Sequence, residues 1–369
     1  MTPRLLLALA AVSAGAILPA RAAGAQQSAP VRATSVILVT LDGLRWQELF
    51  GGADSSLLAD TSVTRDTAAR ARYWRDTAGE RRRALMPFFW DVIAAQGQVF
   101  GDRSAGGGMR VTNGRKFSYP GYQEMLAGYP DSAIASNAKL PNPNVTVLEW
   151  LLTRPGLAGR IAVFGTWDVF PFIINEERSS IPVNAGWEPL ALRQPTPGQE
   201  LLNTLMETLP RIWEGERYDA LTYRAAKEYF VAEGPNVLYL ALGETDDWAH
   251  EDRYDRYLDA ARNGDAFIRD LWEAVQASPR HRYRTALIVT TDHGRGSGRA
   301  GWSRHGAAVD GAEWVWAAVL GPDTPALGSR ADVADATQAQ VAATVAALLG
   351  EDYRAAQPRA APPLPGVVR

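Results

Sequence analysis

The chain has 369 residues, of which 46% are hydrophobic, and a formal net charge of −3. This length and composition suit one large α/β domain or two smaller ones. The interspersed charges exclude the basic surface of a nucleic-acid-binding protein. Cysteine is absent, which excludes disulfides, thiolate metal sites and cysteine nucleophiles. Any metal would therefore have to be held by His, Asp and Glu.

The first residues have the pattern of a signal peptide. Arg4 is followed by an apolar run over 5–18 and then by small residues. This pattern predicts a signal peptide over residues 1–25, cleaved after Ala22 or Ala25, and a periplasmic or secreted protein. The apolar run is too short to span a membrane, although an uncleaved anchor is the alternative. We expect a polar linker over 26–34.

The rest of the chain alternates buried strands with helices. Apolar runs predict strands at 35–41, 98–101, 159–165, 236–243, 285–291 and 313–321. Amphipathic patterns predict helices at 84–97, 122–126, 146–153, 253–277 and 337–349, and a mostly helical insert at 195–235. The alternation predicts an α/β fold over 35–354: a three-layer, doubly wound, mostly parallel sheet with helices on both faces. We expect a loop with one short helix at 45–83 and a mobile tail at 355–369.

Three of the predicted strands are followed by an acidic residue: Asp42, Asp246 and Asp292. In open α/β sheets, ligands bind beyond the carboxyl ends of the strands. A buried carboxylate there is costly unless a cation or several donors hold it. The alternative is that each aspartate merely caps the next turn. The histidines favour the first interpretation.

Three of the four histidines lie near these acids or near the sixth strand. His293 is adjacent to Asp292, His250 comes four residues after Asp246, and His305 precedes the strand at 313–321. Taken singly, these are a hydrogen-bonded pair, a chance helical spacing and a loop residue. Together with the three acids they form six nitrogen and oxygen donors, enough for two borderline divalent ions. Such a pair, ~3.5–4 Å apart, clamps the attacking and leaving oxygens of a displacement. His281 looks like a solvated loop residue, and we leave it out.

A two-metal site of this kind needs an attacking oxygen. Ser118 stands where a helix begins, and free backbone donors and the helix dipole favour an anion at that point. A divalent ion would lower the pKa of its hydroxyl and make it a nucleophile. The alternative is that Ser118 only caps the helix.

These residues resemble the alkaline phosphatase superfamily, and most of all its nucleotide pyrophosphatase/phosphodiesterase-like branch and exported bacterial relatives. The matching motifs are Val-Thr-Leu-Asp42-Gly, Phe-Ser118-Tyr-Pro-Gly-Tyr-Gln-Glu-Met-Leu-Ala-Gly128, Glu244-Thr-Asp246-Asp-Trp-Ala-His250, Thr-Asp292-His293-Gly and His305-Gly306. The resemblance implies two zinc ions, or manganese or another divalent ion in their place. It implies a phosphoserine intermediate on Ser118. It implies that one ion is held by Asp246, His250 and His305, and the other by Asp42, Asp292 and His293.

The nucleophile motif departs from that branch. The branch usually has Thr followed by Phe-Pro-Asn-His, whereas this chain has Ser118-Tyr119-Pro120-Gly121-Tyr122. Phosphate contacts from the missing Asn and His therefore cannot be assumed. Asn113, Arg115 and Lys116 are the nearby candidates for that role, and their alternative is a solvated polar loop.

The implied function is an exported hydrolase of small-molecule phosphate mono- or diesters. A sulfatase is one alternative, but its motif requires an arginine where Tyr122 stands. A second is a phosphomutase, which an exported location disfavours. A third is a non-catalytic exported binding protein, which the complete ligand set disfavours. The natural substrate and the oligomeric state are not determined by the sequence.

Overall fold

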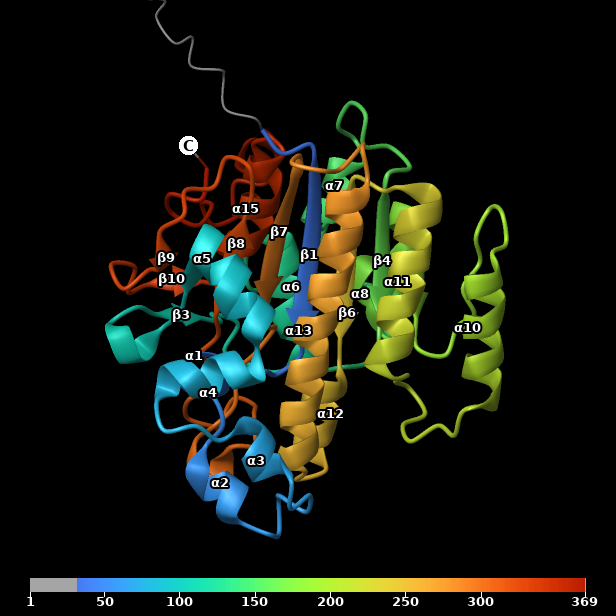
Figure 1. Ribbon diagram of the computed structural model, residues 1–369. Coiled ribbons are helices and arrows are strands. Elements are labelled where there is room, and N and C mark those ends of the chain that lie inside the picture. Colours follow the sequence, from blue (N-terminus) through green and yellow to red (C-terminus); the bar gives the residue numbers. More distant parts are fainter. Residues whose placement is uncertain (1–31, 369) are drawn as a thin grey trace, which may run out of the picture. The chain divides into compact units, whose positions relative to one another are not determined.

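The computed structural model describes residues 32–368, and in this region an eight-stranded sheet forms the centre of the fold (Figure 1). The strand order is β5-β4-β6-β1-β7-β8-β2-β9, and β8 alone runs antiparallel to both of its neighbours. A two-stranded sheet pairs β3 (Met109–Arg110) with β10 (Ala336–Thr337). The strands of the large sheet are β1 (Ser35–Leu41), β2 (Gln98–Phe100), β4 (Ile161–Gly165), β5 (Val183–Ala185), β6 (Val237–Leu242), β7 (Thr285–Thr290), β8 (Ala317–Leu320) and β9 (Gly328–Ser329).

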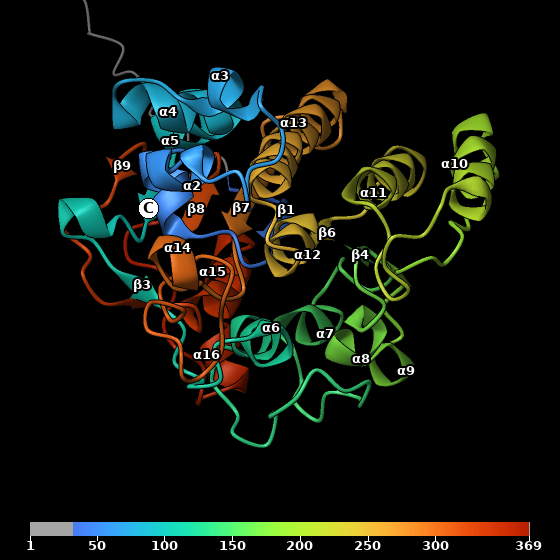
Figure 2. The same cartoon turned by 90° about the horizontal axis from the view of Figure 1, so that it is seen from below.

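Helices cover both faces of the sheet, as the view from below shows (Figure 2). β1 is buried along its whole length because alternate side chains enter two separate cores: Ile37 and Val39 one, Val36 and Leu38 the other. The first core lies under α4 (Ala78–Leu85), η1 (Phe89–Ile93), α5 (Ala94–Gln96), α11 (Asp219–Glu233) and α13 (Tyr254–Ala277). The second lies under α6 (Ser118–Ala127), α7 (Val147–Leu151), α8 (Phe170–Ile174) and α15 (Gln340–Leu348). The predicted three-layer, mostly parallel architecture is confirmed.

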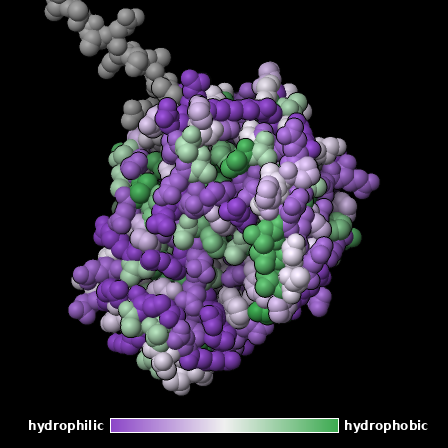
Figure 3. Space-filling model, turned by 45° about the vertical axis from the view of Figure 1, so that its right-hand side comes forward, coloured by the Kyte–Doolittle hydropathy of each residue, from purple (hydrophilic) through white to green (hydrophobic). Residues whose placement is uncertain are grey.

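The remaining helices lie at the ends and edges of these layers. They are α1 (Trp46–Gly51), α2 (Ser55–Ala59), α3 (Ala69–Tyr73), η2 (Arg103–Ala105), α9 (Glu176–Ser179), α10 (Pro197–Thr208), α12 (Glu244–His250), α14 (Gly298–Gly301) and α16 (Tyr353–Ala356). The predicted helical stretch at 195–235 contains α10 and α11. Leu201 and Leu205 of α10 are exposed, and the surface on that side of the molecule carries a hydrophobic patch (Figure 3). In the described residues no helix is long and apolar enough to cross a membrane.

Two sequence expectations about segments were wrong. The stretch 45–83 contains α1, α2 and α3 and the start of α4, rather than one short helix, because its sparse apolar residues, such as Leu49 and Leu57, are buried in the first core. The tail was expected to be mobile, but its described part packs on the fold. Leu364 and Val367 are buried in the second core, and the Leu364 N–H donates to Thr344 Oγ1 (2.9 Å). The predicted signal peptide and most of the predicted linker lie outside the described residues.

The three central strands β6, β1 and β7 are parallel neighbours, so their carboxyl ends meet at one edge of the sheet. Asp42 directly follows β1, Asp292 follows β7 after one residue, and Asp246 lies in the first turn of α12 just beyond β6. This edge therefore brings the predicted site together.

Candidate metal centre and nucleophile

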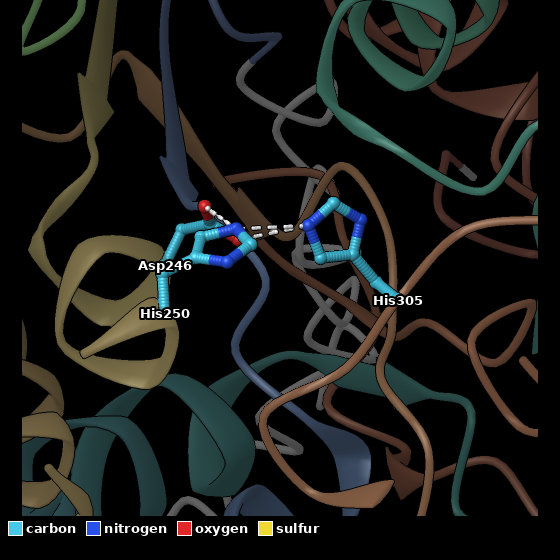
Figure 4. A group of neighbouring side chains, drawn as sticks. All are labelled: Asp246, His250 and His305. Atoms are coloured by element: carbon cyan, nitrogen blue, oxygen red, sulfur yellow. Dashed lines mark hydrogen bonds and ion pairs between the residues drawn. The ribbon is translucent and has the colours of Figure 1, made fainter. Parts of the chain in front are cut away.

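The six predicted ligands form two neighbouring triads. Within each triad, the candidate ligand atoms all lie within 4.8 Å of one another. The exposed triad combines Asp246 and His250 of α12 with His305 from the loop after α14 (Figure 4). The buried triad combines Asp42, Asp292 and His293. The structure thus brings together all six residues that the sequence singled out, in the two sets that the resemblance implied.

The buried triad surrounds one ring nitrogen of His293. Its Nε2 atom lies 3.3 Å from Asp42 Oδ1 and 3.6 Å from Asp292 Oδ2. Its Nδ1 atom lies 2.9 Å from the carbonyl oxygen of Gly294, to which a protonated Nδ1 donates. That hydrogen bond selects the tautomer whose Nε2 lone pair faces the two carboxylates.

Each carboxylate of the buried triad has one oxygen held by the protein and one left over. Asp292 Oδ1 accepts from the Gly43 backbone N–H (3.0 Å), and Asp42 Oδ2 accepts from the Tyr122 hydroxyl (2.7 Å). Asp42 Oδ1 and Asp292 Oδ2 are buried and accept no hydrogen bond from the described residues. Buried polar oxygens normally have a partner. These two therefore fit a cation that binds between them and His293.

Contacts with neighbouring groups also hold the two histidines of the exposed triad. His305 Nδ1 lies 3.3 Å from the carbonyl oxygen of Lys116, and His250 Nε2 lies 3.0 Å from Asp246 Oδ2. The Nε2 atoms of His250 and His305 are 3.0 Å apart and converge on the same point. Asp246 Oδ1 is also 3.5 Å from His293 Nε2, so Asp246 lies between the two triads.

Burial and charge shape the titration of these groups. Burial raises the pKa of Asp292, and the facing charge of Asp42 raises it further. Burial acts against ionisation of Asp42 as well, but His293 and the Tyr122 hydroxyl outweigh it and lower its pKa. For His293, burial favours the neutral ring, yet the two carboxylates prevail and raise the pKa to about 9. Positive charge at this point is therefore strongly favoured.

Ser118 is the first residue of α6, which begins four residues earlier than predicted. It is buried, and its Oγ lies 3.4 Å from His293 Nε2. The cap position of α6 is Phe117, whose side chain makes no capping hydrogen bond. Ser118 Oγ faces the buried triad, and its role as nucleophile stays a prediction.

The predicted phosphate contacts are placed less favourably. Asn113 uses its carboxamide oxygen for the Lys116 and Arg115 backbone N–H groups and donates to Glu124. The Lys116 ammonium pairs with Glu313 (3.0 Å). The polar groups of Asn113 and Lys116 thus hold the loop together. A phosphate contact by Asn113, Arg115 or Lys116 stays a prediction.

His281, which we expected to be solvated, is buried near the opposite edge of the sheet. Its Nδ1 lies 3.1 Å from Ser35 Oγ, at the beginning of β1, and its ring packs against Phe230. It has no place in the metal centre.

Three further residues that the sequence did not single out lie at or beside the site: Tyr122 and Arg295 contact a candidate ligand, and Asn137 contacts the residue after Ser118. Tyr122 holds Asp42, as described above, and follows Ser118 by one helical turn, a spacing that could have revealed it. Asn137 Oδ1 accepts from the Tyr119 backbone N–H (3.0 Å), next to the nucleophile. The buried Arg295 donates to Asp246 Oδ1 and to the Gly43 carbonyl oxygen. Asn137 and Arg295 carry no sequence signal, because only the folded loops bring them here.

No family model matches the sequence, and no curated protein matches it. Solved structures do. A 2-O GAG sulfatase matches with a TM-score of 0.54 at 12% identity, over 87% of this chain and 71% of that one. A putative sulfatase from Bacteroides thetaiotaomicron matches with a TM-score of 0.53 at 12% identity, over 87% and 71%. The lipoteichoic acid synthase from Listeria monocytogenes matches with a TM-score of 0.53 at 10% identity, over 88% and 74%.

The chain shares the fold of these three structures, a mostly parallel central sheet with helices on both faces. Two of these structures are named as sulfatases and one as a lipoteichoic acid synthase, and they do not single out the nucleotide pyrophosphatase/phosphodiesterase branch. At 10–12% identity the likeness extends to the fold. The reaction therefore has to be inferred from this chain's own residues.

Proposed function

We propose that this protein is an exported hydrolase of phosphate mono- or diesters, with Ser118 as nucleophile beside two divalent ions. One observation carries the proposal. Asp42 and Asp292 each have one buried oxygen that accepts no hydrogen bond within the described residues, and both oxygens face the Nε2 atom of His293. The Ser118 hydroxyl lies 3.4 Å from the same nitrogen. This arrangement places a cation site and a nucleophile side by side.

The donor sets suit zinc. Each triad offers carboxylate oxygens and imidazole nitrogens, three ligands in all, which leaves a position open for substrate. Manganese or another borderline divalent ion would accept the same donors. When bound, such ions lower the pKa of the nucleophile and neutralise charge on the transferred group and the leaving oxygen.

Ser118 would transfer the phosphoryl group in two steps. In the first, its Oγ forms a bond to phosphorus while the bond from phosphorus to the leaving alcohol's oxygen breaks, and the alcohol departs with a proton. In the second, water attacks the phosphorus atom and the bond from Oγ to phosphorus breaks, which restores the hydroxyl and releases phosphate from a monoester substrate or a phosphate monoester from a diester substrate. The start of α6 holds Ser118 in place, and the positive end of the helix dipole favours the negative charge of the transferred group.

Asn137 is a further candidate for a contact with that group, because it is hydrogen-bonded to the residue that follows Ser118. Its carboxamide oxygen is used by Tyr119, and its NH₂ group makes no hydrogen bond within the described residues. The NH₂ group is a neutral donor beside Ser118. It would act in the role that the sequence predicted for Asn113, Arg115 and Lys116.

A substrate panel with metal analysis tests the proposal. Purified protein is assayed for zinc content and for turnover of an aryl phosphate, an aryl phosphodiester and an aryl sulfate. Zinc-dependent turnover supports the proposal if phosphate is released from the monoester or a phosphate monoester from the diester. Turnover of the sulfate alone would favour a sulfatase. Transfer within a sugar phosphate without free phosphate would favour a mutase, and metal-free protein without activity a binding protein.

Export is a separate part of the proposal, supported by the signal-peptide pattern at 1–25. Expression with the native N-terminus, followed by fractionation and mass measurement, tests it. A periplasmic or secreted product that begins after Ala22 or Ala25 is expected. A full-length product retained in the cytoplasm would contradict it.

A further inference from the structure

The buried triad is attached to the nucleophile helix through a tyrosine. The Tyr122 hydroxyl donates to Asp42 Oδ2 over 2.7 Å, and both side chains are almost completely buried. The contact leaves Asp42 with one oxygen, Oδ1, directed at His293. A carboxylate can bind an ion through one oxygen or both, and here a protein donor already holds one of them.

We propose that Tyr122 is a positioning residue for the buried metal triad, because its hydroxyl reserves Asp42 Oδ2 and presents Oδ1 to the ion. The inference rests on the proposed function, since it presupposes that the triad binds a cation. Donors of this kind orient metal ligands, and their removal typically costs about 10–100-fold in metal affinity or activity.

The position of Tyr122 makes this contact specific. Tyr122 follows Ser118 by four residues on α6, so both side chains lie on the same face of one rigid turn. Its ring packs edge-to-face on Phe170, with centroids 4.9 Å apart. The hydroxyl therefore has little freedom to leave Asp42. The same helix turn sets the nucleophile and the orientation of a ligand.

A glycine allows α6 to come this close. A Cβ atom on Gly121 would lie 2.4 Å from the carbonyl oxygen of Asp292, which no side chain tolerates. Gln338 Nε2 further joins the carbonyl oxygens of Gly121 and Thr291, each over 3.3 Å. The first turn of α6 is thus packed against the ends of β1 and β7, where the buried triad lies.

Tyr239 provides a matched control. It is also a buried tyrosine, and it packs on the same Phe170 with centroids 5.7 Å apart. Its hydroxyl pairs with Thr40 Oγ1 (3.1 Å), however, and touches none of the six candidate ligands. Tyr239→Phe therefore removes a buried hydroxyl of the same kind without affecting a ligand.

The experiment measures zinc binding directly. Stepwise zinc dissociation constants are determined for wild type, Tyr122→Phe and Tyr239→Phe by competition with a chromophoric chelator, with circular dichroism as the check of folding. We expect Tyr122→Phe to raise the dissociation constant of one of the two zinc ions by about 10–100-fold. Tyr239→Phe should change neither dissociation constant. With excess zinc, kcat of Tyr122→Phe should recover towards wild type, while KM stays the same throughout.

A double-mutant cycle shows whether the effect passes through Asp42. In an Asp42→Ala background, Tyr122→Phe should lower the zinc affinity no further, because the acceptor of the tyrosine hydroxyl is already gone. A folded Tyr122→Phe protein that binds both ions as wild type does would overturn the inference. So would a Tyr122→Phe chain that does not fold while Tyr239→Phe does, since the hydroxyl would then be structural. Wild-type protein that binds no zinc would instead refute the proposed function itself.

Discussion

The hydroxyl oxygen of Ser118 lies 3.4 Å from Nε2 of His293, although the two residues are 175 positions apart in the chain. Ser118 comes from the first turn of α6 on one face of the sheet, and His293 from the segment that follows β7. The same nitrogen faces the orphan oxygens of Asp42 and Asp292. The nucleophile and the buried triad are therefore adjacent, and both face Nε2 of His293.

Removing the Ser118 hydroxyl should abolish catalysis and leave the metal in place. Ser118→Ala is expected to lower kcat for an aryl phosphate by about 10³-fold or more, because no other group replaces the attacking oxygen. Zinc content should stay at the wild-type value, since the hydroxyl belongs to neither triad. Persisting turnover with full zinc content would show that the nucleophile is a different group.

Zinc should stabilise the fold, and the stabilisation should depend on Asp292. A ligand that binds only the native state adds about 2.7 kcal/mol at a free concentration of 100 Kd. Chelation should therefore lower the Tm of wild type. Asp292→Asn should reduce the zinc content to one ion per chain and shrink this shift. His281→Ala is the control, because that histidine lies near the other edge of the sheet. Equal stoichiometry in Asp292→Asn and wild type would exclude Asp292 as a ligand.

The metal-free protein should lose stability as the pH rises from about 6.5 to about 9. His293 has its pKa raised from 6.5 to about 9 by the facing carboxylates. Its stabilising charge is therefore fully present below pH 6.5 and is lost as the pH rises through the folded pKa. The raised pKa of Asp292 acts in the same direction. Urea unfolding in the presence of chelator measures this, and a rise in stability over the interval would contradict it.

Zinc affinity should follow the opposite trend with pH. The ring of His293 must lose its proton before Nε2 can bind an ion, so binding releases a proton. Below a pKa of about 9, the affinity of one ion should therefore increase by about tenfold per pH unit. Chelator competition between pH 6 and 9 tests this, and a flat profile for both ions would count against His293 as a ligand.

A substitution of Asn137 tests whether its side chain contacts the substrate or only accepts the Tyr119 N–H at the start of α6. Asn137→Asp keeps an oxygen for the Tyr119 backbone N–H but replaces the NH₂ donor by a negative charge. If the NH₂ group contacts the transferred group, kcat/KM should fall by about 10²-fold. Ala135→Asp adds the same charge to the same exposed loop and should have a much smaller effect. Unchanged kcat/KM in Asn137→Asp would reduce Asn137 to a cap.

Gly121→Ala should destabilise the protein. The new Cβ would meet the Asp292 carbonyl oxygen at 2.4 Å, so α6 has to shift. Such overpacking costs about 1–3 kcal/mol, which urea unfolding can measure. Gly51→Ala, at the end of α1 where the Cβ meets nothing within 4 Å, should be close to neutral. Equal stability of both variants would mean that α6 tolerates displacement.

Local pattern was sufficient for the strands and for the ligand candidates. The apolar runs before Asp42 and Asp292 are readable because a strand buried on both faces leaves no polar alternation. The start of α6 was placed too late, because Ser118, Tyr119 and Pro120 do not show helical periodicity and their burial comes from tertiary packing. The tail was misjudged for a similar reason. Its isolated residues Leu364 and Val367 are buried because they pack against the second core in the folded chain.

The sequence by itself determined the layered α/β fold, the three acids beyond the strands and the three histidines near them. Parallel strands end at one edge, so apolar runs that end in acids already indicate where the acids meet. Only the tertiary structure decided which oxygens stay unpartnered, that Tyr122 holds Asp42, and that Asn137 and Arg295 lie at the site. Those features depend on side-chain directions and loop paths over distances in the chain that no local pattern encodes.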